Sequence, residues 1–254
     1  MNAIYAKLGI GGGIGTENTT LAEQMEKLTK APLFHQPGER FTYGLNTDLL
    51  GYLIEVISGK SLDKFLDERL FKPLGMKDTY FQIPKEKQNR LATLYSEEKD
   101  KTMKKVSPNS KANGLNINYP NSENSYPSGG AGLSSTILDY SIFLQMLLNN
   151  GEYNGKRILS RNTVRMMTMN QIGDLSISKA TNKFGLGFEI TTELGSAKLP
   201  HQIGSFNWGG IFSTSFWVDP KEKIVAQLFL QKYPNSYGDL HNKFKVLVYQ
   251  AITD

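Results

Sequence analysis

The chain has 254 residues, enough for one large domain, and its 39% hydrophobic and 21% charged content is ordinary for a globular protein with a core. The net charge of +5 is mild, and acidic residues interrupt the lysine-rich run at 85–105, so a solvated surface is favoured over a nucleic-acid partner. The absence of cysteine excludes disulfides and thiolate nucleophiles. The histidines His35, His201 and His241 lack metal-ligand spacing, so we expect no metal and no cofactor.

The first fifteen residues, MNAIYAKLGIGGGIG, lack a basic head followed by an apolar core, so we do not expect them to act as a signal peptide. Their glycines do not follow the GxGxxG spacing of a nucleotide-binding loop, and we expect a flexible loop. No run of about 18 apolar residues follows anywhere in the chain, so no membrane span is predicted. These features leave the cellular compartment unknown.

Apolar residues at helical spacing predict five helices in the first part of the chain. The expected starts are residue 20, Asp48, Ser61, Ser134 or Ser135, and Ser160. Three of these helices have strong apolar faces: Leu49, Leu50, Leu53, Ile54 and Ile57; Leu62, Phe65, Leu66 and Leu70; and Ile137, Tyr140, Phe143, Leu144 and Leu147. A long loop rich in Asn, Ser, Gly and Pro is expected at 107–132, and long loops in compact domains are often functional.

From residue 183 the apolar period changes to two, which is typical of strands. We expect strands in KFGLGFEI (183–190), GIFSTSFWVDP (210–220) and KIVAQLFLQ (223–231), with a hairpin turn at Asp219–Glu222. The last segment, 240–251, predicts a helix that covers one face of the sheet. The chain is thus expected to be α+β, a single domain over 1–254 with a mainly helical, loop-rich part at 1–180 and antiparallel strands plus the C-terminal helix at 181–254.

Five segments, in order, resemble the serine β-lactamase-like superfamily, most closely its class C β-lactamase, family VIII carboxylesterase and penicillin-binding protein branch. They are QPGERFTYGLNTDLLGYLIEVISGKSLDKFLDERLFKPLGMKDTYF (36–81), RLATLY (90–95), PSGGAGLSSTILDYSIFLQMLLNNGEYNGKRILSRNTVRMM (127–167), FGLGFEI (184–190) and NWGGIFSTSFWVDP (207–220). The resemblance implies a β-lactamase-like fold and hydrolysis through an acyl-serine intermediate.

Tyr43 matches the tyrosine that this family places at the mouth of its helical region, and the resemblance implies a general base. An acyl-transfer serine needs a base within hydrogen-bond reach. Since the reference pKa of tyrosine is near 10, a phenolate at pH 7 costs about 4 kcal/mol, which a neighbouring lysine cation offsets. Without the flanking match, Tyr43 would be read as a packing aromatic.

Trp208, Gly209 and Gly210 match the family's sheet-strand motif, which is KTG in β-lactamases and often WGG in the esterases. Glycines let the backbone approach a substrate carbonyl closely. By this match the N–H of Ile211 is the oxyanion donor, paired with the N–H of the nucleophile. Tyr126, before Ser128-Gly129-Gly130, is a weaker candidate for lining the substrate site.

Asp48 fits a helix-start residue stabilised by the helix dipole better than a catalytic group. The Met-rich stretch Met166, Met167 and Met169 is typical of core packing.

The family's Ser-x-x-Lys nucleophile motif is not visible before Tyr43, so the nucleophile is unknown. Two matches occur elsewhere. Ser61-Leu62-Asp63-Lys64 reads as a helix cap in a packing segment, and Ser176-Ile177-Ser178-Lys179 reads as a polar connection. We therefore expect an N-terminally incomplete family member that lacks sheet strands and a helix. The sheet edge left open invites self-association or complementation by an N-terminal fragment.

The expected substrate is a small carboxylic ester rather than a β-lactam. Class C β-lactamases typically carry Tyr-x-Asn, whereas here Gly44-Leu45 follows Tyr43 and Asn46 comes one place late. The other Tyr-x-Asn matches, at 119–121 and 233–235, read as ordinary turns. Two alternatives stay open: a β-lactamase or D-amino-acid peptidase, and a non-catalytic fragment that serves as a binding or assembly module.

Overall fold

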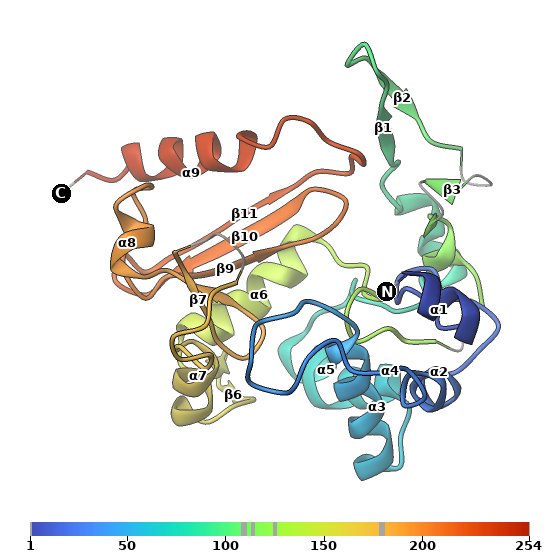
Figure 1. Cartoon of the computed structure of the whole chain (residues 1–254). Helices are drawn as coiled ribbons and strands as arrows, with labels where there is room; N and C mark the ends of the chain where they lie inside the picture. The colour runs from blue at the N-terminus through green and yellow to red at the C-terminus, as the bar shows by residue number, and fades with distance from the viewer. Residues whose placement is uncertain (1, 108–110, 113–114, 124–125, 178–180, 254) are drawn as a thin grey trace. The chain divides into compact units, whose positions relative to one another are not determined.

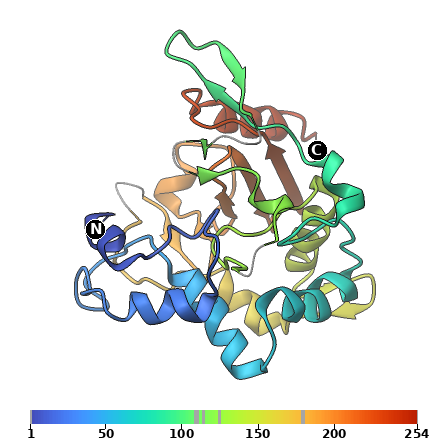
Figure 2. The same ribbon diagram turned by 90° about the vertical axis from the view of Figure 1, so that its right-hand side faces the viewer.

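The computed structural model describes residues 2–107, 111–112, 115–123, 126–177 and 181–253, and it divides into two compact units (Figures 1 and 2). Unit 1 consists of Met1–Gln36, Tyr43–Leu94 and Lys105–Asp139, and unit 2 of Pro37–Thr42, Tyr95–Lys104 and Tyr140–Asp254. Each unit is described by itself.

Unit 1 is mainly helical. Its elements are α1 (Asn2–Leu8), α2 (Leu21–Leu28), α3 (Asn46–Ser58), α4 (Leu62–Leu66), a π-helical turn (Asp67–Phe71), α5 (Lys72–Leu74), two 3₁₀ helices (Lys85–Arg90 and Tyr119–Asn121) and the short pair β3 (Lys111–Ala112) and β4 (Leu115–Asn116). The loop predicted at the N-terminus is wrong for residues 2–8, which form α1 because Ala, Lys and Leu favour a helix up to Gly9.

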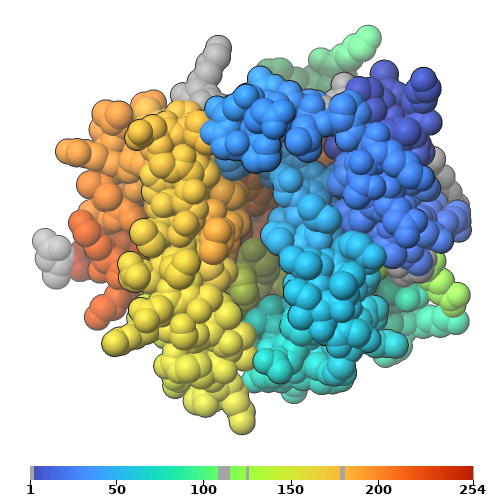
Figure 3. Space-filling model, turned by 60° about the horizontal axis from the view of Figure 1, so that its bottom comes forward, coloured from blue at the N-terminus to red at the C-terminus, as the bar shows by residue number. Residues whose placement is uncertain are grey.

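The helix predicted from Asp48 is present as α3, and it ends at Gly59, whose φ of 67° suits a left-handed cap. Its predicted apolar face, however, is largely at the surface: Leu50 is 56% and Ile57 77% exposed. Figure 3 shows the light-blue atoms of this helix on the surface. The helix instead buries Asp48 and Gly51.

The core of unit 1 contains Leu21, Leu62 and Tyr126, with Ile54 packed against it. Gly51 makes this packing possible, since a Cβ at that position would lie 2.8 Å from Leu62 Cδ2.

Two predicted caps differ in detail. Ser61 precedes α4, but its side chain makes no capping bond; Glu55 Oε1 accepts the Leu62 N–H at 2.9 Å instead. α6 (Ile137–Leu148) is capped by Thr136, whose Oγ1 accepts the Asp139 N–H, and not by Ser134 or Ser135. In both places a better-placed acceptor replaces the predicted hydroxyl.

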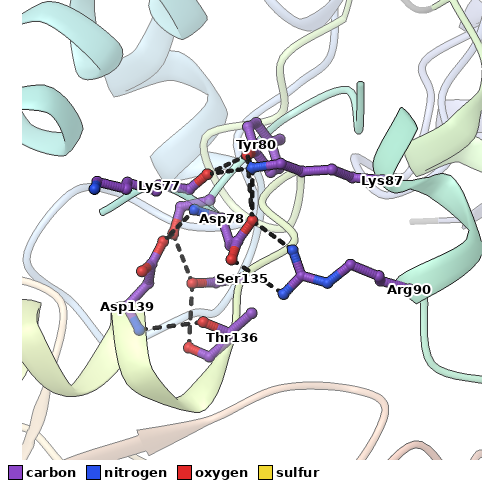
Figure 4. A network of polar contacts seen from close by, with 9 residues as sticks. Lys77, Asp78, Tyr80, Lys87, Arg90, Ser135, Thr136 and Asp139 are labelled. Carbon is purple, nitrogen blue, oxygen red and sulfur yellow. Dashed lines mark hydrogen bonds and ion pairs between the residues drawn. The ribbon is translucent and has the colours of Figure 1, made fainter. Parts of the chain in front are cut away.

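A polar network joins three segments of unit 1 around Asp78 (Figure 4). Arg90 donates to both carboxylate oxygens of Asp78, at 2.8 and 3.0 Å, and Lys87 Nζ lies 2.8 Å from Oδ1. These cations hold the pKa of Asp78 well below its usual range. Asp139, at the start of α6, accepts the Asp78 N–H and the Thr79 hydroxyl. Two residues of the lysine-rich run that was expected to be solvated, Lys87 and Arg90, are thus engaged in ion pairs with Asp78.

Unit 2 is built on a five-stranded antiparallel sheet in the order β11-β10-β9-β8-β7. The strands are β7 (Lys183–Phe184), β8 (Glu189–Ile190), β9 (Phe206–Gly209), β10 (Thr214–Asp219) and β11 (Ile224–Phe229). The other elements are the hairpins β1 (Tyr95–Glu97)–β2 (Met103–Lys105) and β5 (Glu152–Tyr153)–β6 (Lys156–Arg157), and the helices α7 (Arg161–Met167), α8 (Glu193–Ser196) and α9 (Leu240–Gln250).

Helices cover both faces of this sheet. α9 lies over one face, where Phe244 packs edge-on against Trp217 at 5.7 Å between ring centroids (Figure 1). Tyr140 of α6 packs against Phe216 on the opposite face, at 5.3 Å. The α+β layout and the sheet-covering terminal helix are confirmed.

The strand predictions are partly corrected. Residues 183–190 form the hairpin β7–β8 instead of one strand, because Gly187 has a φ of 103° and the chain reverses there. Residues 210–213 are the turn between β9 and β10 rather than the start of a strand. The turn at Asp219–Glu222 is confirmed, since Asp219 Oδ1 accepts the N–H groups of Lys221 and Glu222.

A buried histidine stands out in unit 2. His201 is 4% exposed, and neither ring nitrogen has a hydrogen-bond partner among the described residues. Burial lowers its pKa to about 4, helped by Lys245 and opposed by Asp219. The imidazole is therefore neutral in the folded state down to that pH.

Stability should fall in mild acid because of His201. Its folded pKa lies below the reference value of 6.5, so the unfolded chain binds a proton first as pH drops from about 6.5 towards 4. By pH 4, protonation of this histidine in the unfolded chain should have lowered the free energy of unfolding by up to about 3 kcal/mol. Urea denaturation at several pH values should show a shallower pH dependence for His201→Leu. The His35→Leu variant, at a partly exposed histidine, is the control, and equal slopes for both variants would contradict the assignment.

Candidate functional site

Tyr43 lies in unit 1, three residues before α3, and its side chain is 69% exposed. A phenol in this position is accessible to solvent and to a ligand. The chain that follows it enters α3 through Leu45, which provides no side-chain cap. The first turn of α3 is fixed differently, by a buried acid.

Asp48 in that first turn is 2% exposed. Its Oδ1 accepts the Ser128 hydroxyl at 2.6 Å and the Tyr126 hydroxyl at 3.1 Å. Ser128 Oγ also accepts the N–H of Ala131, at 3.1 Å. A single carboxylate oxygen thus holds the 126–131 segment against the start of α3, three residues after the turn that carries Tyr43.

This arrangement requires close backbone approach. A Cβ at Gly130 would lie 2.9 Å from Asp48 Oδ2, and a Cβ at Gly129 only 2.3 Å from the carbonyl oxygen of Thr47. The Tyr126 side chain is 4% exposed. Burial, together with the neighbouring Asp48 carboxylate, raises the pKa of Tyr126 far above its usual range. Tyr126 is therefore a neutral hydrogen-bond donor in the core of unit 1.

The sequence predicts Asp48 as a helix start stabilised by the helix dipole. It does not indicate Ser128 as the partner of this carboxylate. The available signal was an acid in the first turn of an apolar helix together with a Ser-Gly-Gly run. Neither pattern alone shows that the two segments meet 80 residues apart in the chain.

The strand motif lies in unit 2. β9 pairs with β8 on one side and with β10 on the other, with Trp208 opposite Phe216 and Gly209 opposite Ser215. Gly210 N–H donates to Thr214 O, and Ser213 N–H donates back to Gly210 O at 3.0 Å. Ser213 has a φ of 67°. The connection is therefore a tight turn with Ile211 at its second position.

The N–H of Ile211 makes no hydrogen bond within the part of the chain that the structure describes. The residue is 45% exposed. An unpaired N–H held in a rigid turn is the kind of group that can stabilise a developing oxyanion.

The two glycines of the motif have a reason within the hairpin itself. A Cβ at Gly209 would lie 2.8 Å from Thr214 O, and a Cβ at Gly210 would lie 2.4 Å from Thr214 Oγ1. The sequence motif alone explains these glycines only by the close approach of their backbone to a substrate. The Thr214 carbonyl thus excludes a side chain at Gly209, whereas a side chain at Gly210 would require the Thr214 hydroxyl to turn away.

Trp208 packs in an aromatic row within unit 2. Its ring lies edge-on to Phe184, with centroids 5.2 Å apart, and Phe184 in turn lies 5.0 Å from Phe41. These contacts fix the indole on the face of β9.

Only the first of the two Ser-x-x-Lys sequences lies wholly within the described residues. Ser61 and Lys64 both line a surface cavity of about 520 Å³ in unit 1. No hydrogen bond joins the Ser61 hydroxyl to the Lys64 amine among the described residues. In the second sequence, Ser178 and Lys179 lie outside the described residues.

Within the described ranges, no group of three or more His, Asp or Glu side chains is arranged to hold a metal ion. No helix there combines the length and the apolar content needed to cross a bilayer.

Comparison with known proteins places these features in context. Residues 8–250 match the family model described as Beta-lactamase. The chain is 31% identical to Protein Rv1367c of Mycobacterium tuberculosis (strain ATCC 25618 / H37Rv) over 82% of its own length and 53% of that protein. It is 27% identical to Esterase EstB of Burkholderia gladioli, over 85% of this chain and 56% of the esterase. The chain thus spans about half the length of these relatives.

Among solved structures, the chain superposes on EstCE1, "a hydrolase with promiscuous acyltransferase activity", with a TM-score of 0.83 and 25% identity. The match covers 96% of this chain and 65% of that one. The β-lactamase-like fold expected from the motifs is therefore confirmed.

Removing the Asp48 carboxylate should destabilise unit 1. Asp48→Ala leaves two buried hydroxyls without their acceptor, and we expect a loss of about 2–4 kcal/mol in the free energy of unfolding. Asp48→Asn keeps an acceptor oxygen and should lose less. The measurement is urea denaturation of the whole chain.

The matched control is Asp63→Ala, an exposed acid in the first turn of α4, which should change stability by less than about 0.5 kcal/mol. Equal losses for Asp48→Ala and Asp63→Ala would show that the buried network contributes nothing specific.

Proposed function

Because this chain belongs to the β-lactamase family, we propose that it is part of a serine hydrolase that cleaves small carboxylic esters. The observation that carries the proposal is the turn at Gly210–Ser213, which holds the N–H of Ile211 without a hydrogen-bond partner among the residues that the structure describes. Such a donor serves the negatively charged oxygen that forms when a carbonyl is attacked.

In the proposed reaction, a serine oxygen attacks the ester carbonyl carbon and gives up its proton to the Tyr43 phenolate. The carbonyl oxygen becomes an oxyanion, which accepts hydrogen bonds from the Ile211 N–H and from the N–H of the nucleophile. The bond to the alcohol oxygen then breaks, and that oxygen takes the proton from Tyr43 as it leaves. Water, deprotonated by the same residue, hydrolyses the acyl-serine and restores the starting state.

Two features favour esters over β-lactams as substrates. The strand motif reads Trp208-Gly209-Gly210 rather than KTG, and Tyr43 is not followed by the Tyr-x-Asn spacing. Among the relatives, EstB is named as an esterase and EstCE1 as a hydrolase with acyltransferase activity. A β-lactamase or D-amino-acid peptidase activity is the alternative on the same chemistry.

We assign no nucleophile within residues 1–254. Ser61 makes no hydrogen bond to Lys64 within the described residues, so a lysine-activated serine has no support there. The nucleophile is proposed to come from a polypeptide segment outside these residues, either covalently connected or added as a separate fragment. Without that segment the chain would be a non-catalytic binding or assembly module.

The test compares purified residues 1–254 with the natural gene product. Each is incubated with p-nitrophenyl butyrate, a chromogenic cephalosporin and a D-Ala-D-Ala peptide, and then with a fluorophosphonate followed by intact mass. We expect no adduct on residues 1–254 and ester turnover with one adduct on the natural product. An adduct on Ser61 would overturn the assignment of the nucleophile, and failure of both proteins to turn over any substrate would leave the non-catalytic alternative.

Tyr43→Phe should lower kcat for the ester in the active form by roughly 10²-fold or more, since it removes the general base. Tyr237→Phe, at a tyrosine that is 48% exposed, is the matched control and should keep its activity. Equal kcat values for the two variants would remove Tyr43 from the mechanism.

A further inference from the structure

Ser213, which closes the turn that carries Ile211, has an unusual backbone conformation. Its φ of 67° lies in the left-handed region that favours glycine, yet the residue bears a side chain. A non-glycine residue persists in such a conformation only where the surrounding structure holds it, and residues of this kind gather at functional sites. The groups that hold Ser213 are therefore the groups that fix the Ile211 turn.

Both the carbonyl and the hydroxyl of Ser213 are held by residues that follow the β9–β10 hairpin. The carbonyl oxygen lies 3.1 Å from Nε2 of His241, at the start of α9, and also accepts the N–H of Leu230 at 3.3 Å. Since a carbonyl oxygen can only accept, this ring nitrogen of His241 carries a proton and is the donor. The Ser213 hydroxyl donates to the Lys232 carbonyl and accepts from the Asn235 side-chain amide, both at 3.0 Å.

The segment 232–236, which supplies both partners of the hydroxyl, is fixed in turn by Glu97 of β1. The Lys232 amine forms an ion pair with the Glu97 carboxylate, and the two side chains are only 10% and 7% exposed. Glu97 also accepts the N–H of Ser236, at 3.2 Å, and the hydroxyl of the same residue. Lys232 N–H donates to the carbonyl of Phe212, inside the turn, at 3.1 Å. One carboxylate thus fixes both ends of the segment that holds the turn.

The charge of Glu97 is needed for this arrangement. The Lys232 amine, together with Ser236, lowers the pKa of Glu97 to about 2, so the carboxylate is ionised at any pH used for an esterase assay. Lys232 also lies over the Tyr237 ring, with its amine 4.3 Å from the ring centroid. A buried cation without a counter-ion is costly, so removal of the Glu97 charge should shift the segment until Lys232 reaches water.

We propose that His241 and Glu97 are positioning residues that aim the Ile211 N–H at the developing oxyanion. His241 acts directly on the Ser213 carbonyl, and Glu97 acts through Lys232; neither touches the reacting atoms. This inference rests on the proposed function, in which the Ile211 N–H is an oxyanion donor. Such a donor is effective at about 2.7–3.1 Å from the oxygen, so a small displacement of the turn costs more in transition-state stabilisation than in substrate binding.

The kinetic test uses the natural gene product with p-nitrophenyl butyrate. His241→Leu removes the donor and should lower kcat roughly tenfold while KM stays within about twofold, because the loss falls on the transition state. His241→Gln keeps an N–H donor at a similar reach and should recover most of the lost kcat. His35→Leu, the same exchange at another partly exposed histidine, is the control and should keep its kcat.

Glu97→Gln tests the second positioning residue. It removes the charge with little change in size, and it should lower kcat in the same way as His241→Leu. Its control is Glu98→Gln, at the neighbouring exposed acid, which should keep its kcat. Should Glu97→Gln fail to fold, His241→Leu still tests the proposal, since it removes no buried charge.

The order of the Ile211 amide gives a test that does not depend on turnover. With ¹⁵N-isoleucine labelling of the same protein, the Ile211 signal is identified by its loss in Ile211→Val. Its order parameter should be about 0.85 in the parent, as in rigid backbone, and should fall towards about 0.6 in His241→Leu but not in His35→Leu. A parent that cleaves no ester would refute the proposed function, and this measurement would still decide the positioning.

Unchanged Ile211 order in both His241→Leu and Glu97→Gln overturns the proposal. Equal kcat values for His241→Leu and His35→Leu in an active parent also overturn it. A loss of kcat in His241→Leu that His241→Gln fails to recover counts against it as well, because the hydrogen bond to Ser213 is then not what matters.

Discussion

The Asp48 carboxylate is the contact on which the organisation of unit 1 depends. It is 2% exposed and accepts two hydroxyl donors, from Ser128 and Tyr126. A buried carboxylate whose hydrogen bonds are made stabilises the folded state modestly. Removing it leaves its two hydroxyl donors unsatisfied, which costs more free energy of unfolding. The helix that follows Tyr43 and the 126–131 segment are therefore fixed together. The turn that carries the exposed Tyr43 side chain leads directly into this rigid start of α3.

In unit 2 the turn that carries Ile211 is closed by its own backbone rather than directly by a buried acid. The connection between β9 and β10 is held by the backbone bonds of Gly210 and Ser213, and the Thr214 carbonyl leaves no room for a side chain at Gly209. In this tight turn the N–H of Ile211 makes no hydrogen bond to any part of the chain that the structure describes. A proposed oxyanion donor is thus a by-product of local hairpin geometry, and it would exist whether or not a substrate ever bound.

The sequence predicted the parts of the fold that depend on local patterns. The helix starts near Asp48 and Ser61, the turn after Asp219 and the period change after residue 183 each follow from a few neighbouring residues. Predictions failed where the outcome depends on a distant partner. Nothing near Leu50 or Ile57 indicates that α3 buries Asp48 and Gly51 instead, because that choice is made by Leu62 and by Ser128. The motif positions of Tyr43 and Trp208 were available from resemblance, whereas the bond from Ser128 to Asp48 required the structure.

Each candidate element is stabilised by contacts within its own unit. Tyr43 is placed by a helix fixed through Asp48, and Ile211 by a turn fixed through Thr214, and neither set of contacts includes a serine nucleophile. A chain without that serine can therefore keep both elements in shape. The features that mark the family in this sequence are in this sense independent of catalysis, so their presence alone does not require turnover.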